Sequence, residues 1–219
     1  MLMFPATKPL PLTVPTIVGE SATSFASRLA RRNGAPRRIT FCSDVGIDYF
    51  ALVNGDPLEI QRMAVLGGID PVPLQASTPS LIEAGWFQLG DEHIKFTGLI
   101  RTTLRICPRC VQDAPDRTGI IHHGVWQVAA IRTCQKHGCH LVAVPKPKNG
   151  NDCFDHIPVL NGFKPTAGDL AVSQDLELER YLTVRIQDGP GQSWLDRLPF
   201  HMAAQTCEML GALLTLGPR

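Results

Sequence analysis

The apolar and polar positions at the start of the chain predict an extended strap followed by a helix. Residues 1–19 carry four prolines, a density that disfavours a helix and favours an extended segment on the surface. Residues 20–24 then supply N-cap side chains, and Phe25 and Leu29 follow at helical spacing. Asn33-Gly34 predicts a left-handed end to this first helix.

Further short helices are predicted before residue 80. Apolar side chains predict one helix over residues 39–55. Pro57 suits the first position of the next helix, which runs to Gly67-Gly68, and residues 69–77 lead into another short one. Short helices joined by glycine-containing turns are typical of a helix-turn-helix arrangement.

The rest of the chain changes from strand-like to irregular and then to helical patterns. Aromatic and branched residues with glycine turns predict short strands or irregular structure over residues 81–104, and frequent proline and glycine make residues 145–168 loop-like. Apolar residues at helical spacing predict one helix around residues 176–182 and a last helix after Pro199.

Two pairs of metal-ligating residues lie between these regions, with 23 residues separating the pairs. Each pair has two intervening residues, so each can sit on one tight turn. Three thiols and one imidazole form the tetrahedral set that zinc prefers, and four protein ligands leave no open position for water. The sequence therefore predicts one structural Zn²⁺ bound by Cys107, Cys110, Cys134 and His137.

Other histidines and cysteines near these pairs offer alternatives. Cys139 and His140 follow His137 closely and could replace it as the fourth ligand, although the spacing favours His137. His122 and His123 have no partner at ligand spacing and are expected as surface or core histidines. Trp126 is expected to pack in the core beside the metal.

Together these patterns predict a mainly α-helical fold class with a small zinc-binding module. We divide the chain into a helical, helix-turn-helix-like part over residues 1–100, a zinc-binding module with short β strands over residues 101–148, and a helical C-terminal part over residues 149–219.

Composition adds the expected cellular compartment. Apolar residues make up 44% of the 219 residues, which is too many for a disordered chain. No stretch reaches the roughly 18 uninterrupted apolar residues of a membrane span, and the N-terminus does not resemble a signal peptide. Seven cysteines are an odd number, which favours reduced thiols over a disulfide scaffold. We therefore expect a cytoplasmic protein.

The net charge of +1 hides an uneven distribution. Residues 28–38 carry five arginines and no acid, giving +5, and residues 101–148 carry eight Lys or Arg against two Asp, giving +6. Residues 39–100 and 149–219 are acidic, at −6 and −4. Two basic blocks suggest an anionic partner, of which nucleic acid is the commonest.

The first basic block predicts a surface that binds nucleic acid or a partner, made of Arg31, Arg32, Arg37 and Arg38. The competing interpretation is an ordinary solvated helix face. Arg28 either joins this surface or pairs internally with an acid such as Glu20 or Asp44.

Motifs over residues 10–215 resemble the TniQ family. The first group is Pro15, Glu20-Ser21, Ser24, Arg28-Leu29-Ala30 and Asn33-Gly34. The most specific group is Arg105-Ile106-Cys107-Pro108-Arg109-Cys110, Trp126-Gln127, Cys134-Gln135-Lys136-His137 and Leu141. Less specific later segments are Trp194-Leu195-Asp196 and Cys207-Glu208-Met209-Leu210-Gly211.

The resemblance implies a non-catalytic accessory factor in DNA transposition. TniQ-like proteins join a targeting module to the transposase machinery, which includes an AAA+ ATPase, and they combine helix-turn-helix elements with zinc-finger motifs. The implied partners are DNA or a DNA-bound targeting complex and the transposition AAA+ ATPase and transposase. The resemblance also allows a homodimer and implies no membrane partner.

Two other functions compete with this one. A stand-alone zinc-containing DNA-binding transcription regulator would read bases with the helices of residues 57–80. An enzyme would need a cysteine beside a base, and Cys153 with His156 is the best such pair. No Ser-His-Asp order, phosphate loop or paired-carboxylate pattern accompanies that pair, so we expect no enzyme activity.

Overall fold

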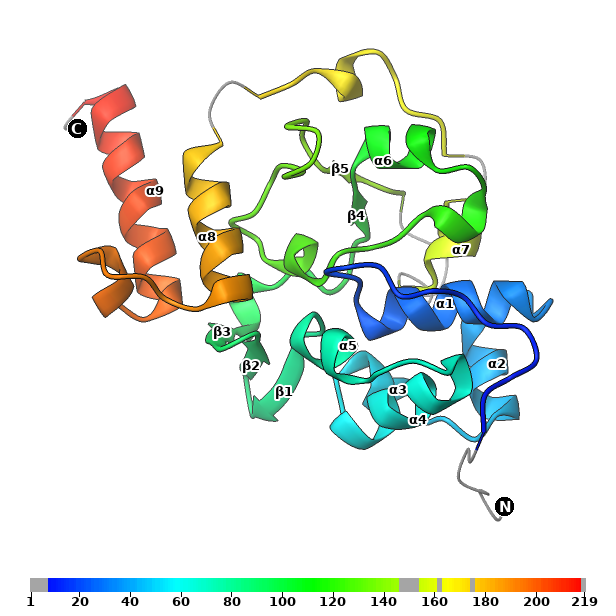
Figure 1. Cartoon of the computed structure of the whole chain (residues 1–219). Helices are drawn as coiled ribbons and strands as arrows, with labels where there is room; N and C mark the ends of the chain where they lie inside the picture. Colours follow the sequence, from blue (N-terminus) through cyan, green and yellow to red (C-terminus); the bar gives the residue numbers. More distant parts are fainter. Residues whose placement is uncertain (1–7, 146–153, 161–162, 174–175, 218–219) are drawn as a thin grey trace.

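A computed structural model of the chain describes residues 8–145, 154–160, 163–173 and 176–217, and it is mainly helical (Figure 1). The helices are α1 (Ala22–Arg32), α2 (Arg38–Asp44), α3 (Tyr49–Val53), α4 (Pro57–Gly67), α5 (Val72–Ala76), α6 (Pro108–Asp113), α7 (His156–Val159), α8 (Glu177–Asp188) and α9 (Phe200–Leu216). The strands are β1 (Ser80–Glu83), β2 (Trp86–Leu89), β3 (Glu92–Lys95), β4 (Arg105–Ile106) and β5 (Val142–Ala143). Short 3-10 turns include η2 (Arg117–Gly119) and η3 (Gly124–Gln127). The predicted fold class is confirmed: helical parts flank a small region with short strands.

Helix α1 begins and ends where its capping residues predict. The Ser24 amide donates to Ser21 Oγ at 3.3 Å, which satisfies one of the free amides at the helix start. The helix ends at Asn33, and Gly34 follows with a φ of 75°. The predicted helix after Pro57, the short helix before Ser77 and the two C-terminal helices are likewise present as α4, α5, α8 and α9.

The prediction of one helix over residues 39–55 is wrong, because this segment forms two helices, α2 and α3. Gly46 lies between them with a φ of 74°, a backbone conformation that a helix cannot include. Asp48 then accepts hydrogen bonds from the amides of Phe50 and Ala51 and starts α3 as its N-cap. The apolar pattern continues across the break because both helices bury side chains in the same cluster.

Two small antiparallel sheets follow the first five helices. Strands β1, β2 and β3 form one sheet in that order, with Phe87 opposite Ile94 in the β2–β3 pair. Of the short strands or irregular structure predicted over residues 81–104, strands are present up to Lys95. Strands β4 and β5 form the second sheet, which pairs Ile106 with Val142.

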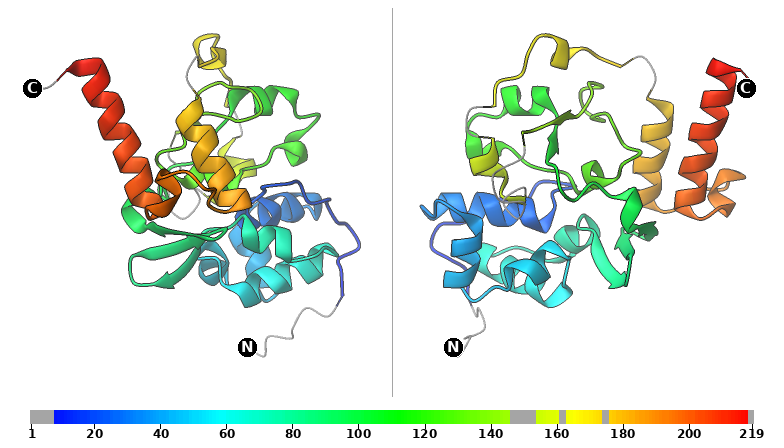
Figure 2. Two further views of the ribbon diagram at one scale, coloured as in Figure 1. Left: turned by 60° about the vertical axis from the view of Figure 1, so that its left-hand side comes forward. Right: turned by 180° about the vertical axis from the view of Figure 1, so that it is seen from behind.

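The buried apolar side chains form two clusters. The N-terminal cluster comprises Val14, Ile47 and buried residues of α1 to α5, ending with Leu74. The central cluster runs from Phe87 to Ala204 and joins the β2–β3 hairpin, the segment of residues 99–144, α8 and the first turns of α9. Figure 2 shows the far end of α9 pointing away from the body of the protein. The division into residues 1–100, 101–148 and 149–219 remains a prediction.

Hydropathy adds one finding about the helices. Within the described ranges, no helix combines the length and the apolar character that crossing a bilayer requires.

Candidate metal centre

The first ligand pair is held at the start of α6. Cys107 follows β4 directly and is the N-cap of α6, where its Sγ accepts a hydrogen bond from the Cys110 amide at 3.3 Å. Pro108 occupies the first helical position, where a missing amide proton carries no penalty. One turn of helix therefore brings the Cys107 and Cys110 thiols to the same end of α6.

The second ligand pair lies on a tight turn that returns the chain toward β5. The Gly138 amide donates to the Cys134 carbonyl at 2.7 Å, and the Cys134 amide donates to the Cys139 carbonyl at 2.9 Å. Gly138 has a φ of 66°, which a residue with a Cβ rarely adopts, so glycine makes this turn possible. Strand pairing between β4 and β5 then fixes the two turns beside each other.

The side chains of the four predicted ligands converge. One atom from each of Cys107, Cys110, Cys134 and His137 lies within 4.8 Å of the others. The Nδ1 atom of His137 is 3.3 Å from the Cys107 and Cys110 sulfurs and 3.7 Å from the Cys134 sulfur. The Cys110 and Cys134 sulfurs are 3.9 Å apart.

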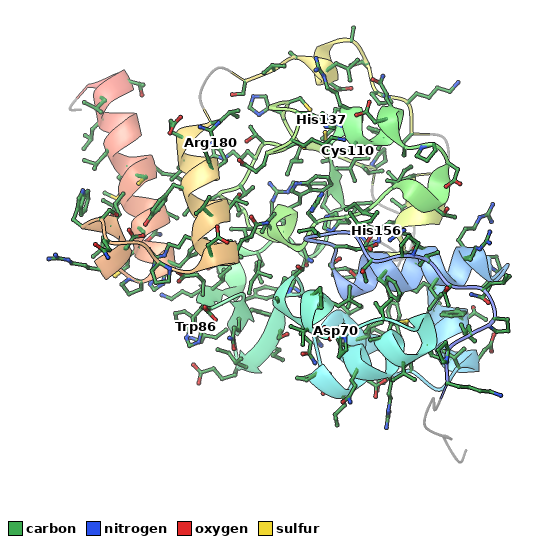
Figure 3. All side chains as sticks on the ribbon, in the orientation of Figure 1. Asp70, Trp86, Cys110, His137, His156 and Arg180 are labelled. Atoms are coloured by element: carbon green, nitrogen blue, oxygen red, sulfur yellow. The ribbon has the colours of Figure 1, made fainter. Side chains whose placement is uncertain are left out.

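These distances fit a tetrahedral zinc ion. Zinc bonds of about 2.3 Å to sulfur and about 2.0–2.1 Å to nitrogen give tetrahedron edges of about 3.5–3.8 Å. Four of the six distances among the ligand atoms, 3.3–3.9 Å, are therefore close to the edges that zinc requires. Figure 3 shows His137 and Cys110 side by side next to α6. The cluster could hold a metal ion, and its donor set of three sulfurs and one imidazole favours zinc.

The three thiols are close enough to shift one another's pKa through hydrogen bonds. Hydrogen bonding with Cys107 and Cys110 lowers the pKa of Cys134. Hydrogen bonding with Cys110 and Cys134 raises the pKa of Cys107. A bound divalent cation would favour the ionised form of all three thiols.

The model of one protein family matches this chain over residues 11–141, which is more than half of it and includes both ligand pairs. The chain belongs to the TniQ family. TniQ proteins are associated with DNA transposition. The match ends before Trp194-Leu195-Asp196 and the segment of residues 207–211, so those weaker resemblances lie outside the matched residues. No curated protein sequence matches the chain.

The alternative ligands occupy other positions in this TniQ-family chain. Cys139 is buried, and its sulfur lies 3.3 Å from the Cys107 sulfur, outside the set of four converging atoms. His140 is exposed. His122 and Trp126 are buried, and Trp126 belongs to the same central cluster as Cys107 and Cys134, as expected for a core anchor.

The structure removes Arg38 from the predicted basic surface. Its side chain is fully buried, and its guanidinium donates to the Thr23 carbonyl at 2.9 Å, to the Tyr49 hydroxyl at 2.7 Å and to the Phe154 carbonyl. A phosphate could reach this group only if α1 and α2 separated, so the prediction of Arg38 as a surface residue is wrong. Arg31, Arg32 and Arg37 are exposed.

Arg28 pairs with an acid inside the protein, the second of the two roles considered for it. Its guanidinium pairs with the Glu20 carboxylate at 2.6 Å, and both side chains are buried. It also donates to the Pro15 carbonyl at 3.1 Å and to the Thr118 carbonyl at 2.5 Å. This arginine therefore fixes the strap and the segment around η2 to α1.

Most described members of the second basic block also have partners within the chain. Three arginines donate to backbone carbonyls: Arg101 to Val53, Arg105 to Trp126 and Val128, and Arg109 to Leu170. The ion-pair partners are Glu208 for Arg132 and Asp113 for Lys136. Lys146 and Lys148 lie outside the described residues. The charge of +6 over residues 101–148 therefore overstates the cationic surface available to a partner.

The candidate cysteine–histidine pair is only half described. Cys153 lies outside the described residues. His156 is buried, and its ring stacks on that of His122 at a centroid distance of 4.9 Å. Burial lowers the pKa of His156 well below its ordinary value. A fully buried imidazole has no access for a substrate, so the described half of the pair does not support a catalytic site.

Proposed function

We propose that this protein is a non-catalytic adaptor in DNA transposition, which links target-site recognition to the transposase and its AAA+ ATPase. The observation that carries the proposal is the TniQ family match over a span that includes the four converging ligands. The proposed partners are DNA or a DNA-bound targeting complex on one side and the ATPase and transposase on the other. The protein would act in the cytoplasm, where thiols stay reduced, as a monomer or a homodimer.

The proposed cofactor is one structural Zn²⁺ held by Cys107, Cys110, Cys134 and His137. When bound, the ion would tie together two turns that are far apart in the sequence. Four protein ligands would leave no position for a substrate, which accords with a role in folding. In this proposal the metal contributes stability and shape, and partner binding takes place elsewhere on the surface.

The proposed contact with DNA is the C-terminal end of α1. Arg31 and Arg32 are adjacent and exposed there, and Arg37 is exposed in the turn before α2. Because Arg28 and Arg38 are used internally, this surface is smaller than the sequence suggested. A surface with few cations favours binding DNA together with protein partners over binding naked DNA tightly.

The stand-alone regulator is less well supported. Its base-reading helices would lie within residues 57–80, where Arg62 is the one basic residue. Arg62 is paired with Glu59 at 2.6 Å. The exposed positions of α4 include Leu58 and Gln61, so this helix lacks the phosphate contacts that position a recognition helix.

Charge reversal tests the proposed surface. The double variant Arg31→Glu/Arg32→Glu is compared with Lys95→Glu/Arg180→Glu, which makes the same change in net charge on β3 and α8, on the other side of the view in Figure 1. Binding is measured by fluorescence anisotropy with a duplex of 30 base pairs, alone and with the transposition ATPase, at several salt concentrations.

We expect the α1 variant to lose at least about tenfold in affinity at low salt, and its salt slope to fall by about two because two phosphate contacts are lost. The control variant should bind like the unaltered protein. If the folded α1 variant keeps full affinity both for DNA and for DNA with the ATPase, Arg31 and Arg32 are an ordinary solvated face.

A further inference from the structure

The imidazole of His137 has a partner on each side. Its Nδ1 atom faces the three sulfurs, whereas its Nε2 atom lies 3.0 Å from the Asp113 Oδ2 atom. The His137 side chain is only 11% exposed, so few other groups can reach Nε2. The carboxylate is therefore the principal polar contact of the nitrogen that points away from the cluster.

Helix α6 supplies both a ligand and this carboxylate. Cys110 and Asp113 are three residues apart on the helix, a spacing that puts their side chains on the same side. The Cys110 sulfur meets His137 Nδ1, and Asp113 meets the opposite edge of the same ring. One face of one short helix thus fixes the imidazole at both nitrogens.

A histidine that binds a metal through Nδ1 must keep its proton on Nε2. Neutral imidazole has one donor nitrogen and one acceptor nitrogen, and the hydrogen bond made by one nitrogen decides which of them carries the proton. A carboxylate that accepts the Nε2 proton leaves the Nδ1 lone pair free and holds the ring in one orientation.

We propose that Asp113 is a positioning residue of the metal site, which accepts the Nε2 proton of His137 and so selects Nδ1 as the fourth ligand atom. This inference rests on the proposed zinc site. It also explains why His137 takes this place when Cys139 and His140 follow it closely. The Cys139 sulfur lies against Cys107, and His140 is exposed to solvent. Of the three, only His137 has a carboxylate among its described contacts, that of Asp113, which contacts its ring on the side away from the sulfurs.

A surface ion pair is the competing explanation for the position of Asp113. The Lys136 Nζ atom lies 3.6 Å from the same Oδ2 atom, but the lysine side chain is 71% exposed. Exposed pairs of this kind contribute little to stability. The shorter contact to the nearly buried ring is therefore the one with a functional consequence.

Zinc affinity provides the test. Four variants are compared with the unaltered protein: Asp113→Ala, Asp113→Asn, Lys136→Ala and Gln112→Ala. Gln112 is exposed on the same helix and serves as the matched control. Affinity is measured by competition with a chromophoric chelator, after circular dichroism shows that each variant is folded. Asp113 is more than half exposed at the end of α6, so its replacement should not prevent folding.

We expect Asp113→Ala to weaken zinc binding by about 10- to 100-fold. Asp113→Asn should fall in between, because its amide oxygen still accepts the proton but carries no charge. Lys136→Ala and Gln112→Ala should stay within about twofold of the unaltered protein. Nitrogen NMR of the zinc form should show a slowly exchanging Nε2 proton on His137, and exchange should become fast in Asp113→Ala.

Equal zinc affinity and equal proton exchange in Asp113→Ala and Gln112→Ala would overturn the positioning role alone. An equally large loss in Lys136→Ala would also overturn it, because the effect would then come from surface charge. If the unaltered protein bound no zinc, the metal site itself would be wrong, together with this inference.

Discussion

His122 and His156 stack on each other inside the protein, and both are almost fully buried. Burial lowers the pKa of His122 to about 3, and it also lowers the pKa of His156 well below the ordinary value of 6.5. Both ring nitrogens of His156 are without a hydrogen-bond partner among the described residues. The ring therefore packs as a neutral aromatic group.

These pKa shifts predict a loss of stability in acid. When the pKa of a histidine is lower in the folded than in the unfolded protein, its neutral form contributes to the free energy of unfolding above about pH 6.5. This contribution is lost as the pH falls, by about 1.4 kcal/mol per pH unit. We expect His156→Phe to be about as stable as the unaltered protein at pH 8 and to show a flatter decline between pH 6.5 and 5. Urea denaturation with saturating zinc measures this, with His93→Gln, at an exposed position, as the control. An unchanged pH slope in His156→Phe would contradict the assignment.

Single residues also show where sequence reasoning is limited. The arginine at position 38 looks like its neighbours in the sequence, but the structure buries it against the Phe154 carbonyl. This partner is more than a hundred residues away, so no local pattern reveals it, whereas the Glu20 partner of Arg28 is only eight residues away. The ligand residues could be predicted because each pair is local. Asp113 belongs to neither ligand pair, although its spacing of three from Cys110 on a helix is a usable signal.

At the scale of elements, the two ligand turns should depend on the metal. Cys134 is one of the four converging ligand residues and begins the second turn, so Cys134→Ala removes one ligand and leaves the turn without its anchor. Loss of a structural metal belongs to the few changes that cost more than about 4 kcal/mol.

We expect Cys134→Ala to bind less than half an equivalent of zinc and to unfold at much lower urea, whereas Cys207→Ala should behave like the unaltered protein. Cys207 is a partly exposed cysteine outside the converging set, which makes it a suitable control. Metal analysis and urea denaturation give the two readings. Full zinc content in folded Cys134→Ala would rule this residue out as a ligand.

Elements with strong end signals were predictable, whereas segments with weak signals were misjudged: residues 39–55, and the short helix α7 within residues 145–168, which look loop-like in the sequence. Ser21 at the start of α1 and Pro57 at the start of α4 mark their helices by side-chain chemistry. Between α2 and α3 the apolar spacing continues, and Gly46 and Asp48 are the only signs of a break. A continuous apolar pattern reports which side is buried, and it does not report whether the backbone between the buried positions stays helical.

For the whole molecule, the two buried clusters should respond differently to metal removal. Cys107 and Cys134 belong to the central cluster, which also contains Leu182 and Ile186 of α8. The N-terminal cluster contains none of the four ligand residues. We expect a chelator to increase hydrogen exchange in α8 and in β2 and β3, while amides of α4 keep their protection. Mass-spectrometric exchange measures this, and equal loss of protection in α4 and α8 would show that the clusters unfold together.

The contacts between α1 and the segment of residues 118–124 also bear on how the chain is made. The Ser21 amide donates to the His122 carbonyl at 3.1 Å, the His122 amide donates to Ser24 Oγ at 2.9 Å, and the Arg28 guanidinium donates to the Thr118 carbonyl at 2.5 Å. A ribosome adds about 5–20 residues each second, so several seconds pass between the synthesis of α1 and the synthesis of these partners. Until then, the described partners of Glu20 and Arg28 are each other, Ser24 of α1 and the strap. During those seconds, the side of α1 that later contacts residues 118–124 stays exposed, because its partners are encoded almost a hundred codons downstream.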